Sequence, residues 1–421
     1  MNGLTICIIG AGSSYTPELI EGFSLMRESL PVREIRLMDI DTHRLEIMEG
    51  FVRRFAAHMN FPVTITATTD RRRAIEGADF INTQIRVGGN AARVKDEKIP
   101  LSYGLIGQET TGAGGMMKAL RSIPVMLDIA RDVERYSPNA WIINYTNPTG
   151  LVTEAITRHT KAKIAGLCSG GLFPQQWTAR ALGVPKESVR YDYVGLNHMN
   201  FAYNVTVDGR PITDAEFDLI ADRVWSVDHD MIRQLRVLPS PYLQYFFHTT
   251  QRVKEMRQAP RTRGEEVQLL EKEVFAGYQD PEGHTKPEAL KKRGGGGYSE
   301  VALSIMKAVA SRSDVWAVVN VPNQGTVRFL PDNAVIEAAC IVNSAGIKPV
   351  AIGEVPNAVW GLVSAVKNYE QLAVDAAMTG DRRTALLALM AHPLVREYEV
   401  AVPLLNDLLE ANREYLPQFF R

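Results

Sequence analysis

The sequence predicts an α/β protein, in which an N-terminal, Rossmann-like, doubly wound parallel sheet is followed by a C-terminal α+β domain. Short apolar segments rich in β-branched residues alternate with helical segments through the first 167 residues. Such alternation produces a parallel sheet with crossover helices. Beyond this point the alternation is lost, and 421 residues are too many for one simple core. We therefore expect two domains, 1–167 and 168–421, in intimate contact.

The first strand is expected at Leu4–Ile9, a continuous apolar run typical of a strand that is buried on both faces. The segment Gly10–Ser14 follows it. Thr16-Pro17-Glu18 then offers an N-cap, a proline at the first helical position and an acid in the first turn. The remaining strands of this domain are expected at 34–40, 63–68, 79–86, 140–145 and 164–167, with helices near 71–76 and 117–136.

The second domain lacks the regular alternation of strands and helices. Residues 191–207 and 316–321 resemble strands of a mixed sheet, because they are rich in β-branched and aromatic residues. The tail from 357 to 420 is expected to be largely helical, since four leucines share one helical face. These leucines are Leu404, Leu405, Leu408 and Leu409.

Composition and charge exclude several classes of protein. Hydrophobic residues make up 45% and charged residues 23%, as in soluble globular proteins. The formal net charge of −1 provides no field that would attract nucleic acid or an anionic membrane. No apolar run reaches the roughly 18 residues of a membrane span, and the N-terminus lacks the pattern of a secretory signal. We expect neither nucleic acid nor a membrane as a partner.

The three cysteines are Cys7, Cys168 and Cys340, an odd number at wide spacings that implies no disulfide framework. A reducing compartment fits this pattern, so we expect a cytoplasmic protein. Cys7 and Cys340 lie in apolar runs and are expected in the core.

A Gly10-x-Gly12 turn between a buried strand and a helix is where a dinucleotide pyrophosphate docks. Tyr15 replaces the third glycine of the usual pattern, and a plain tight turn is the alternative explanation. Asp39 ends the second strand, where an acid accepts hydrogen bonds from the adenosine ribose hydroxyls. Asp41 is the second candidate for that role, or a cap for the next helix. The predicted cofactor-binding residues are Gly10, Gly12, Ser13, Ser14, Asp39 and Arg86.

Cys168 follows a predicted strand end, where open α/β sheets place their ligands. His198 lies thirty residues later in Gly195-Leu196-Asn197-His198. A lone cysteine and a lone histidine are structural by default. As a metal pair, they would leave coordination positions open for substrate oxygens and water, as a catalytic metal requires.

Two polar clusters, 107–112 and 144–148, are expected at the ends of predicted strands, although solvated loops would explain them equally well. Asn147-Pro148 resembles the Asn-Pro turn of lactate and malate dehydrogenase-like folds, where that turn approaches the nicotinamide. Arg93 and Arg263 stand near loops, and a single such arginine is most often a surface charge.

Taken together, these segments resemble glycoside hydrolase family four. The resemblance is carried by residues 8–18, 99–112, 144–148, 166–168, 195–198 and 241–245, and it extends to 410–415. Within the family, Lys292-Arg293-Gly294-Gly295 and Thr262-Arg263-x-x-Glu266-Val267 are most similar to the 6-phospho-β-glucosidase branch.

The resemblance implies a glycosidase that works by transient oxidation of its sugar, an exception to hydrolysis by two carboxylates. NAD⁺ takes hydride from the sugar C3, and a divalent metal, Mn²⁺ or another transition metal, polarises the resulting ketone. A base removes the acidified C2 proton and the glycosidic oxygen leaves. Water then adds to C1, and NADH reduces C3 again.

The resemblance also implies residue roles. The metal ligands are Cys168 and His198, the base is Tyr242, and Glu109 raises the basicity of that tyrosine; Arg93, Asn147 and Arg263 bind the sugar or its 6-phosphate. An arginine fork suits a phosphate through paired, charge-assisted hydrogen bonds. The substrate is expected to be a small sugar glycoside, and the protein a homodimer or homotetramer.

One segment departs from the family pattern. In the α-glycoside branches the residue after the metal cysteine is often an aspartate that protonates the leaving group, whereas the phospho-β-glucosidases carry Asn-x-Pro. This chain has Ser169-Gly170-Gly171 there. Serine is a poor general acid, which favours a β-linked substrate. The loop leaves the sugar and the aglycone open, and an unphosphorylated or α-linked sugar is the alternative.

Two functions outside the family compete with this hypothesis. A 2-hydroxyacid dehydrogenase could use the same fold, but the matching histidine-centred motif is absent, and net accumulation of NADH would reveal it. An NAD-binding sensor would keep Gly10, Gly12 and Asp39 but would need neither the metal pair nor Tyr242.

Overall fold

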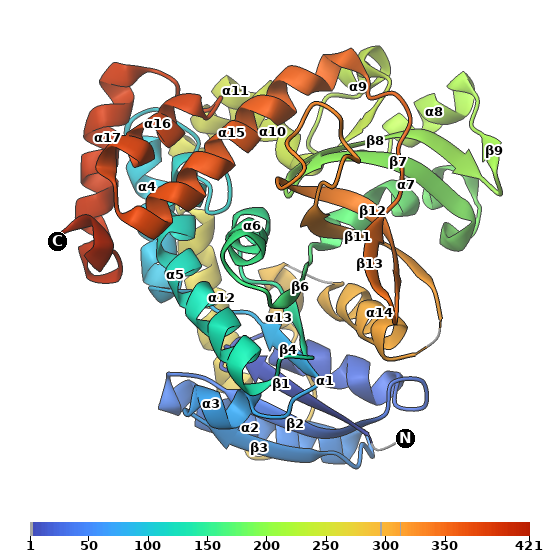
Figure 1. Cartoon of the computed structure of the whole chain (residues 1–421), viewed down its shortest axis with the longest axis vertical. Coiled ribbons are helices and arrows are strands. Elements are labelled where there is room, and N and C mark those ends of the chain that lie inside the picture. Colours follow the sequence, from blue (N-terminus) through green and yellow to red (C-terminus); the bar gives the residue numbers. More distant parts are fainter. Residues whose placement is uncertain (1–2, 295–296, 312) are drawn as a thin grey trace.

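The computed structural model describes residues 3–294, 297–311 and 313–421. Its centre is a nine-stranded sheet in the order β13-β12-β11-β6-β5-β4-β1-β2-β3 (Figure 1). The first six strands run parallel, and their order reverses on either side of β1, as in a doubly wound sheet. They span Leu4–Ile9 (β1), Val32–Met38 (β2), Thr64–Thr68 (β3), Phe80–Thr83 (β4), Trp141–Asn144 (β5) and Lys163–Gly166 (β6). The predicted fold class is confirmed.

Three predicted details of this domain are wrong. Helix α1 begins at Thr16 with Tyr15 as its N-cap residue, because the Thr16 hydroxyl donates to the Ala11 carbonyl at 2.7 Å. Strand β4 ends at Thr83, three residues earlier than predicted, and the next side chain, Gln84, donates from Nε2 to Thr16 Oγ1 at 2.8 Å. The cluster 107–112 precedes helix α5 (Gly112–Tyr136), not a strand end.

Helices cover both faces of the parallel strands. The helices of this part are α1 (Thr16–Leu25), α2 (Thr42–His58), α3 (Arg71–Ile75), α4 (Gly89–Ser102), α5 and α6 (Thr149–His159). Helix α4 was not predicted. Its sequence is polar in the middle, and its buried side includes the charged residues Arg93, Asp96 and Glu97, so apolar periodicity is weak.

Strands from the second half of the chain extend the same sheet. They are β11 (Val315–Pro322), β12 (Val335–Asn343) and β13 (Gly346–Pro349), which pair antiparallel. Strand β11 joins β6 through the pair Asn320 and Gly166. The sheet therefore takes strands from both sides of residue 167, and a division at that residue stays a prediction.

The predicted segment 191–207 forms a separate antiparallel hairpin. Strands β7 (Val189–Leu196) and β8 (Met199–Val207) pair with each other, and the short strands β9 (Arg210–Pro211) and β10 (Leu238–Pro239) pair with β8. The turn of the hairpin is Asn197-His198. This second sheet lies at the upper right of Figure 1, above the green helix α7.

The remaining helices surround the two sheets. They are α7 (Phe173–Leu182), α8 (Asp214–Ala221), α9 (His229–Leu235), α10 (Gln244–Phe247), α11 (Thr249–Gln258), α12 (Arg263–Gln279), α13 (Ala289–Arg293), α14 (Tyr298–Ala310), α15 (Asn357–Thr379), α16 (Arg382–Ala391) and α17 (Tyr398–Ala411). The helical tail is confirmed, and its four predicted leucines are buried. Helices α16 and α17 flank one side of the molecule (Figure 1).

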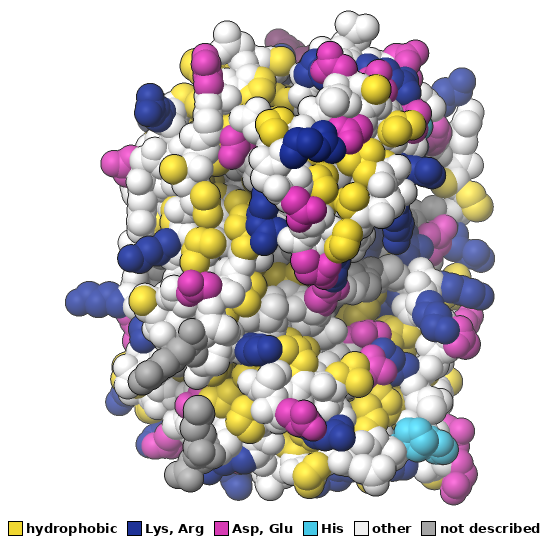
Figure 2. Space-filling view, turned by 90° about the vertical axis from the view of Figure 1, so that its right-hand side faces the viewer, with side chains coloured by type: hydrophobic (Ala, Val, Ile, Leu, Met, Phe, Trp, Pro, Cys, Tyr) yellow, Lys and Arg dark blue, Asp and Glu magenta, His cyan; other side chains and the backbone are white. Residues whose placement is uncertain are grey.

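Cys7 and Cys340 are fully buried as predicted, and all three cysteines are free thiols. Basic and acidic side chains are interspersed over the face shown in Figure 2, in agreement with the near-zero net charge. Among the described residues, no helix has both the length and the apolar character needed to cross a membrane.

Candidate active site

The glycine turn after β1 and the acid after β2 form one unit. Gly10 has φ +86°, and a Cβ atom there would lie 2.9 Å from the Gln84 carbonyl oxygen. The Gly12 amide donates to Asp39 Oδ2 at 2.7 Å, which fixes the carboxylate at the end of β2. Asp41 caps α2 by accepting from the Arg44 amide at 3.0 Å. Asp39 therefore lies beside the glycine turn, whereas Asp41 serves as a helix cap.

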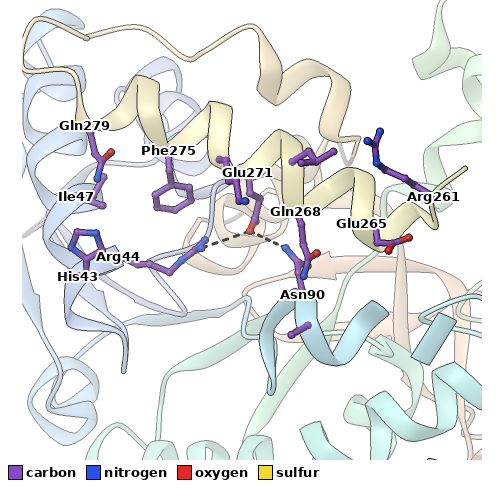
Figure 3. Close-up of a pocket in the computed structure, with 13 residues that line it drawn as sticks. His43, Arg44, Ile47, Asn90, Arg261, Glu265, Gln268, Glu271, Phe275 and Gln279 are labelled. Carbon is purple, nitrogen blue, oxygen red and sulfur yellow. Dashed lines mark hydrogen bonds and ion pairs between the residues drawn. The ribbon is translucent and has the colours of Figure 1, made fainter. Parts of the chain in front are cut away.

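A cavity of about 690 Å³ opens between the segments that follow β2 and β4. These segments flank β1, where a doubly wound sheet binds a nucleotide. Arg44 and Asn90 line the cavity from opposite sides, and Phe275 covers it from α12 (Figure 3). The Arg44 guanidinium also donates to the Gly12 carbonyl at 2.9 Å, which connects the cavity to the glycine turn. The volume suits an adenosine group.

Glu271, on α12, occupies a position beside the glycine turn that sequence reasoning missed. Its carboxylate accepts from Ser14 Oγ at 3.3 Å, Asn90 Nδ2 at 2.8 Å and Arg293 Nη2 at 2.9 Å. Figure 3 shows Arg44 and Asn90 pointing toward it. These donors are the kind that hold an anion such as a phosphate. The nearest signal in the sequence was the Lys292-Arg293 motif.

The two motifs that suggested the phospho-β-glucosidase branch meet in the structure. The Arg263 guanidinium donates to the carbonyls of Lys292 and Arg293 at 3.0 and 2.9 Å and pairs with Glu266 at 2.9 Å. Gly295 of this motif lies outside the described residues. Arg263 thus holds the segment that carries Arg293, whose guanidinium lies 4.6 Å above the Tyr15 ring.

Glu109 lies at the centre of a cluster of three cations. Its carboxylate pairs with Arg86, with Arg93 at 3.0 Å and with Lys118 at 2.7 Å. Burial favours the neutral acid, but the charges of Arg86, Lys118 and Arg93 hold the Glu109 pKa well below its usual range. Burial and the Arg86 charge lower the Lys118 pKa to about 7. The predicted effect of Glu109 on Tyr242 stays a prediction.

His198 and Tyr242 lie face to face. Their ring centroids are 3.7 Å apart and the planes differ by 4°. His198 has φ +66° in the hairpin turn between β7 and β8, an uncommon conformation for a residue other than glycine. Burial and the Lys118 charge lower the His198 pKa to about 3, so the imidazole is neutral, as a metal ligand must be.

A short hydrogen-bond chain defines the tautomer of His198. The Thr110 hydroxyl donates to Gln108 Oε1 at 3.0 Å. A hydroxyl that donates to Gln108 is an acceptor toward His198 Nδ1, which lies at 3.0 Å, and this arrangement favours the tautomer with its hydrogen on Nδ1. The lone pair of Nε2 is then the one that can bind a metal. Gln108 and Thr110 belong to the predicted polar cluster, but their link to His198 was not foreseen.

Cys168 follows β6 and begins a short 3₁₀ helix. Its sulfur accepts from the Gly170 amide at 3.4 Å. Burial raises the pKa of the thiol to about 12, and the nearby Glu337 carboxyl acts in the same direction. The Gly170 amide and the Asn197 side chain, which adjoins His198, act in the opposite direction and lower the pKa of the thiol.

The donor atoms fit the expected metal and cofactor. Cys168 and His198 offer one sulfur and one imidazole nitrogen, a set that suits divalent transition metals. Within the described part of the chain, no cluster of three or more acidic, histidine or cysteine side chains could hold a metal. Asn147 Oδ1 is buried and has no hydrogen-bond partner among the described residues, as expected of an atom awaiting a ligand.

Replacing Thr110 by valine is expected to weaken Mn²⁺ binding by about 10–100-fold, because His198 loses the acceptor that orients its ring. The dissociation constant can be measured by titration calorimetry, with NAD⁺ binding as the internal reference. Thr111→Val is the matched control, since its side chain caps no backbone group of α5. Equal Mn²⁺ affinities in the two variants would contradict the proposed tautomer.

Comparison with known proteins gives a consistent result along the chain. A family model described as family 4 glycosyl hydrolase matches residues 5–184, and one described as its C-terminal domain matches residues 193–395. A 6-phospho-beta-glucosidase of Escherichia coli (strain K12) is 37% identical over 435 residues, covering 99% of this chain and 97% of that protein. A 6-phospho-alpha-glucosidase of Leptotrichia buccalis is 30% identical and covers 99% of both chains.

Solved structures extend the comparison. The 6-phospho-beta glucosidase from Thermotoga maritima with NAD and glucose-6-phosphate superposes with a TM-score of 0.92 at 34% identity, covering 98% of this chain and 99% of that one. A form of that protein with manganese, NAD⁺ and glucose-6-phosphate gives 0.89. Malate dehydrogenase from Plasmodium falciparum gives 0.56 at 14% identity, over 89% of this chain and 99% of that one, a likeness of fold alone.

Proposed function

Because the chain belongs to the family 4 glycosyl hydrolases, we propose that it hydrolyses a 6-phospho-β-glucoside with NAD⁺ and a divalent metal bound. The observation that carries the proposal is the combination, in one chain, of a dinucleotide turn with a cysteine and a histidine poised for a metal. The relatives from Escherichia coli and Thermotoga maritima support the substrate, and the ligands of the latter support both cofactors.

The residues divide the work as follows. Asp39 would accept from the adenosine ribose, and the backbone around Gly10 and Gly12 would receive the pyrophosphate. Asn147 would bind the sugar close to the nicotinamide. Cys168 and His198 would hold the metal. When bound, NAD⁺ and the metal supply reversible hydride transfer at the sugar C3 and polarisation of its oxygen.

Tyr242 would then remove the C2 proton of the substrate. The stacking of its ring on the neutral imidazole of His198, one of the two proposed metal ligands, supports this role. Glu109 pairs with three cations, and the Lys118 charge lowers the His198 pKa more than the Glu109 charge raises it. A positive field of this kind would favour the tyrosinate, the form that acts as a base.

A β-linked substrate fits the residue that follows the metal cysteine. Ser169 offers a hydroxyl, which is a poor acid for protonating a leaving oxygen. Elimination from C2 lessens the need for such an acid. The greater identity to the phospho-β-glucosidase of Escherichia coli than to the phospho-α-glucosidase of Leptotrichia buccalis agrees with this choice.

A phosphorylated substrate is expected to have a higher kcat/KM than the same nitrophenyl β-glucoside without phosphate. The phosphate would use the cations of the segment that Arg263 holds, above all Arg293. Arg263→Ala and Arg293→Ala should each reduce the preference by about 10–100-fold, as for the loss of a charged hydrogen bond. Lys291→Ala, an exposed cation in the same helix, is the control. Equal or better turnover of the unphosphorylated glycoside would show that the phosphate assignment is wrong.

The dehydrogenase alternative predicts a different balance of products. A family 4 glycosidase regenerates its NAD⁺ in each turnover, so NADH, followed by its absorbance, should not accumulate when substrate is added.

We further propose that the protein is a cytoplasmic homodimer or homotetramer with domains 1–167 and 168–421. Its three free cysteines support a reducing compartment.

A further inference from the structure

We propose that Glu337 is the positioning residue of the metal site: this carboxylate ties the strand end before Cys168 to the turn that carries His198. The inference rests on the proposed function, because that function places the metal between Cys168 and His198. The two predicted ligands belong to different sheets. Cys168 follows β6 of the large sheet, and His198 lies in the β7–β8 hairpin of the small one.

Four side-chain donors converge on Glu337, which lies on β12 and is 1% exposed. Glu337 Oε1 accepts from Asn197 Nδ2 and from Asn320 Nδ2, both at 3.1 Å. Glu337 Oε2 accepts from Asn200 Nδ2 at 2.6 Å and from the Tyr193 hydroxyl at 3.2 Å. The donors come from β7, β8, β11 and the hairpin turn. Each carboxylate oxygen thus receives two hydrogen bonds.

On one side the network reaches the strand that leads into Cys168. Asn320 Nδ2 also donates to the Gly166 carbonyl at 3.1 Å, two residues before the cysteine. The fit is close, because a Cβ atom on Gly166 would lie 2.9 Å from Asn320 Cβ. Through Asn320, Glu337 therefore holds the end of the strand that leads into the cysteine.

On the other side the network closes the turn of His198. Asn197 precedes the histidine and Asn200 follows it by two residues. Asn200 Nδ2 donates to the Leu196 carbonyl at 3.2 Å as well as to Glu337. A histidine at positive φ persists only where its surroundings determine the backbone. The hydrogen bonds of the two asparagines to one carboxylate fix the backbone of this turn.

The donors of the network suit a carboxylate: burial raises the Glu337 pKa to about 7, and the hydrogen bonds from Asn197, Asn320 and Tyr193 oppose this by favouring the ionised form. An ionised carboxylate is purely an acceptor, with about four lone-pair sites for the four donors. A glutamine would accept at one oxygen only and would turn two N–H donors toward asparagine amides. Among the described residues, the ion pairs include none with Glu337, so its burial is not explained by a neighbouring cation. A buried acid that served packing alone would be replaced at lower cost by an apolar residue.

Glu337→Gln is expected to raise the Mn²⁺ dissociation constant by about 10–100-fold, as for other groups that orient metal ligands. The NAD⁺ dissociation constant should change less than about twofold, because the glycine turn and Asp39 lie outside the network. In activity assays the variant should need a higher Mn²⁺ concentration for half-maximal rate, and kcat should be largely restored when Mn²⁺ is saturating. Mn²⁺ binding is followed by electron paramagnetic resonance, independently of turnover.

Glu154→Gln is the matched control. Glu154 is also fully buried and accepts from the Val335 amide at the start of the same strand β12, at 3.0 Å. Its loss should lower the free energy of unfolding without changing Mn²⁺ affinity. If Glu337→Gln does not fold, Asn200→Ala removes one donor of the network, and it must then weaken Mn²⁺ binding.

Unchanged Mn²⁺ affinity in Glu337→Gln, or an equal loss in Glu154→Gln, would overturn the assignment. If only Asn200→Ala folds, unchanged Mn²⁺ affinity in that variant would also overturn the assignment. A wild-type protein that binds no Mn²⁺ would instead contradict the proposed function itself.

Discussion

Replacement of Tyr242 by phenylalanine is expected to lower kcat by roughly 10²–10⁴ while the protein remains folded. The substitution removes the oxygen that would take the C2 proton and keeps the ring that stacks on His198. A tyrosine with only a packing role would instead lose about 1 kcal/mol of stability and keep most activity. Steady-state kinetics and urea unfolding, measured on the same preparation, separate these two roles.

Tyr245→Phe is the internal control for this experiment. The Tyr245 ring lies 6.2 Å from that of Tyr242 at an angle of 64°, in the adjoining helix α10. Its loss should leave kcat nearly unchanged. In D₂O the sugar product should carry solvent deuterium at C2, because the mechanism requires that proton to leave. Complete retention of the C2 hydrogen, together with near-normal kcat in Tyr242→Phe, would rule out elimination in this protein.

The fold was predictable where local pattern and tertiary environment agree. Strand β1 is apolar because both its faces are covered, so its sequence alone marks it as central. The attachment of β11 to β6 was not predictable, because it depends on one pairing between residues 154 positions apart, Asn320 and Gly166. Helix α4 was missed for a related reason, since its buried Asp96 pairs with Arg121, 25 positions away, and its buried Glu97 accepts from the Gly264 amide, 167 positions away.

Some residues of the candidate site could be predicted from the sequence, and others could not. Gly10, Gly12 and Asp39 were predictable because a βα turn and the end of the next strand have fixed places in this fold. Thr110 could not be connected to His198, which is 88 positions away, until the chain was folded. Glu271 and Glu337 carried no motif at all. Their significance comes from the donors that surround them, and no local pattern records those donors.

Removal of either the metal or NAD⁺ is expected to abolish hydrolysis. Exhaustive chelation should eliminate activity, and Mn²⁺ should restore it; Co²⁺ and Fe²⁺ should substitute in part, because the Cys168 thiolate tolerates softer metals. Protein stripped of NAD⁺ should be inactive even with excess Mn²⁺, since hydride transfer is then impossible. Oxidation of Cys168 should also inactivate, and Cys7 and Cys340 should be protected by their complete burial.

The pH dependence of metal binding tests the same ligands more sharply. With its pKa raised to about 12 by burial, the Cys168 thiol is protonated at neutral pH and must release a proton to the solvent when a metal binds. His198, with a pKa lowered to about 3, is already neutral and releases none. The apparent Mn²⁺ affinity should therefore rise about tenfold per unit between roughly pH 6 and pH 8. Calorimetry in buffers of different ionisation enthalpy should count one proton per metal ion. Full activity after chelation and cofactor removal, or metal binding without proton release, would exclude Cys168 as a ligand.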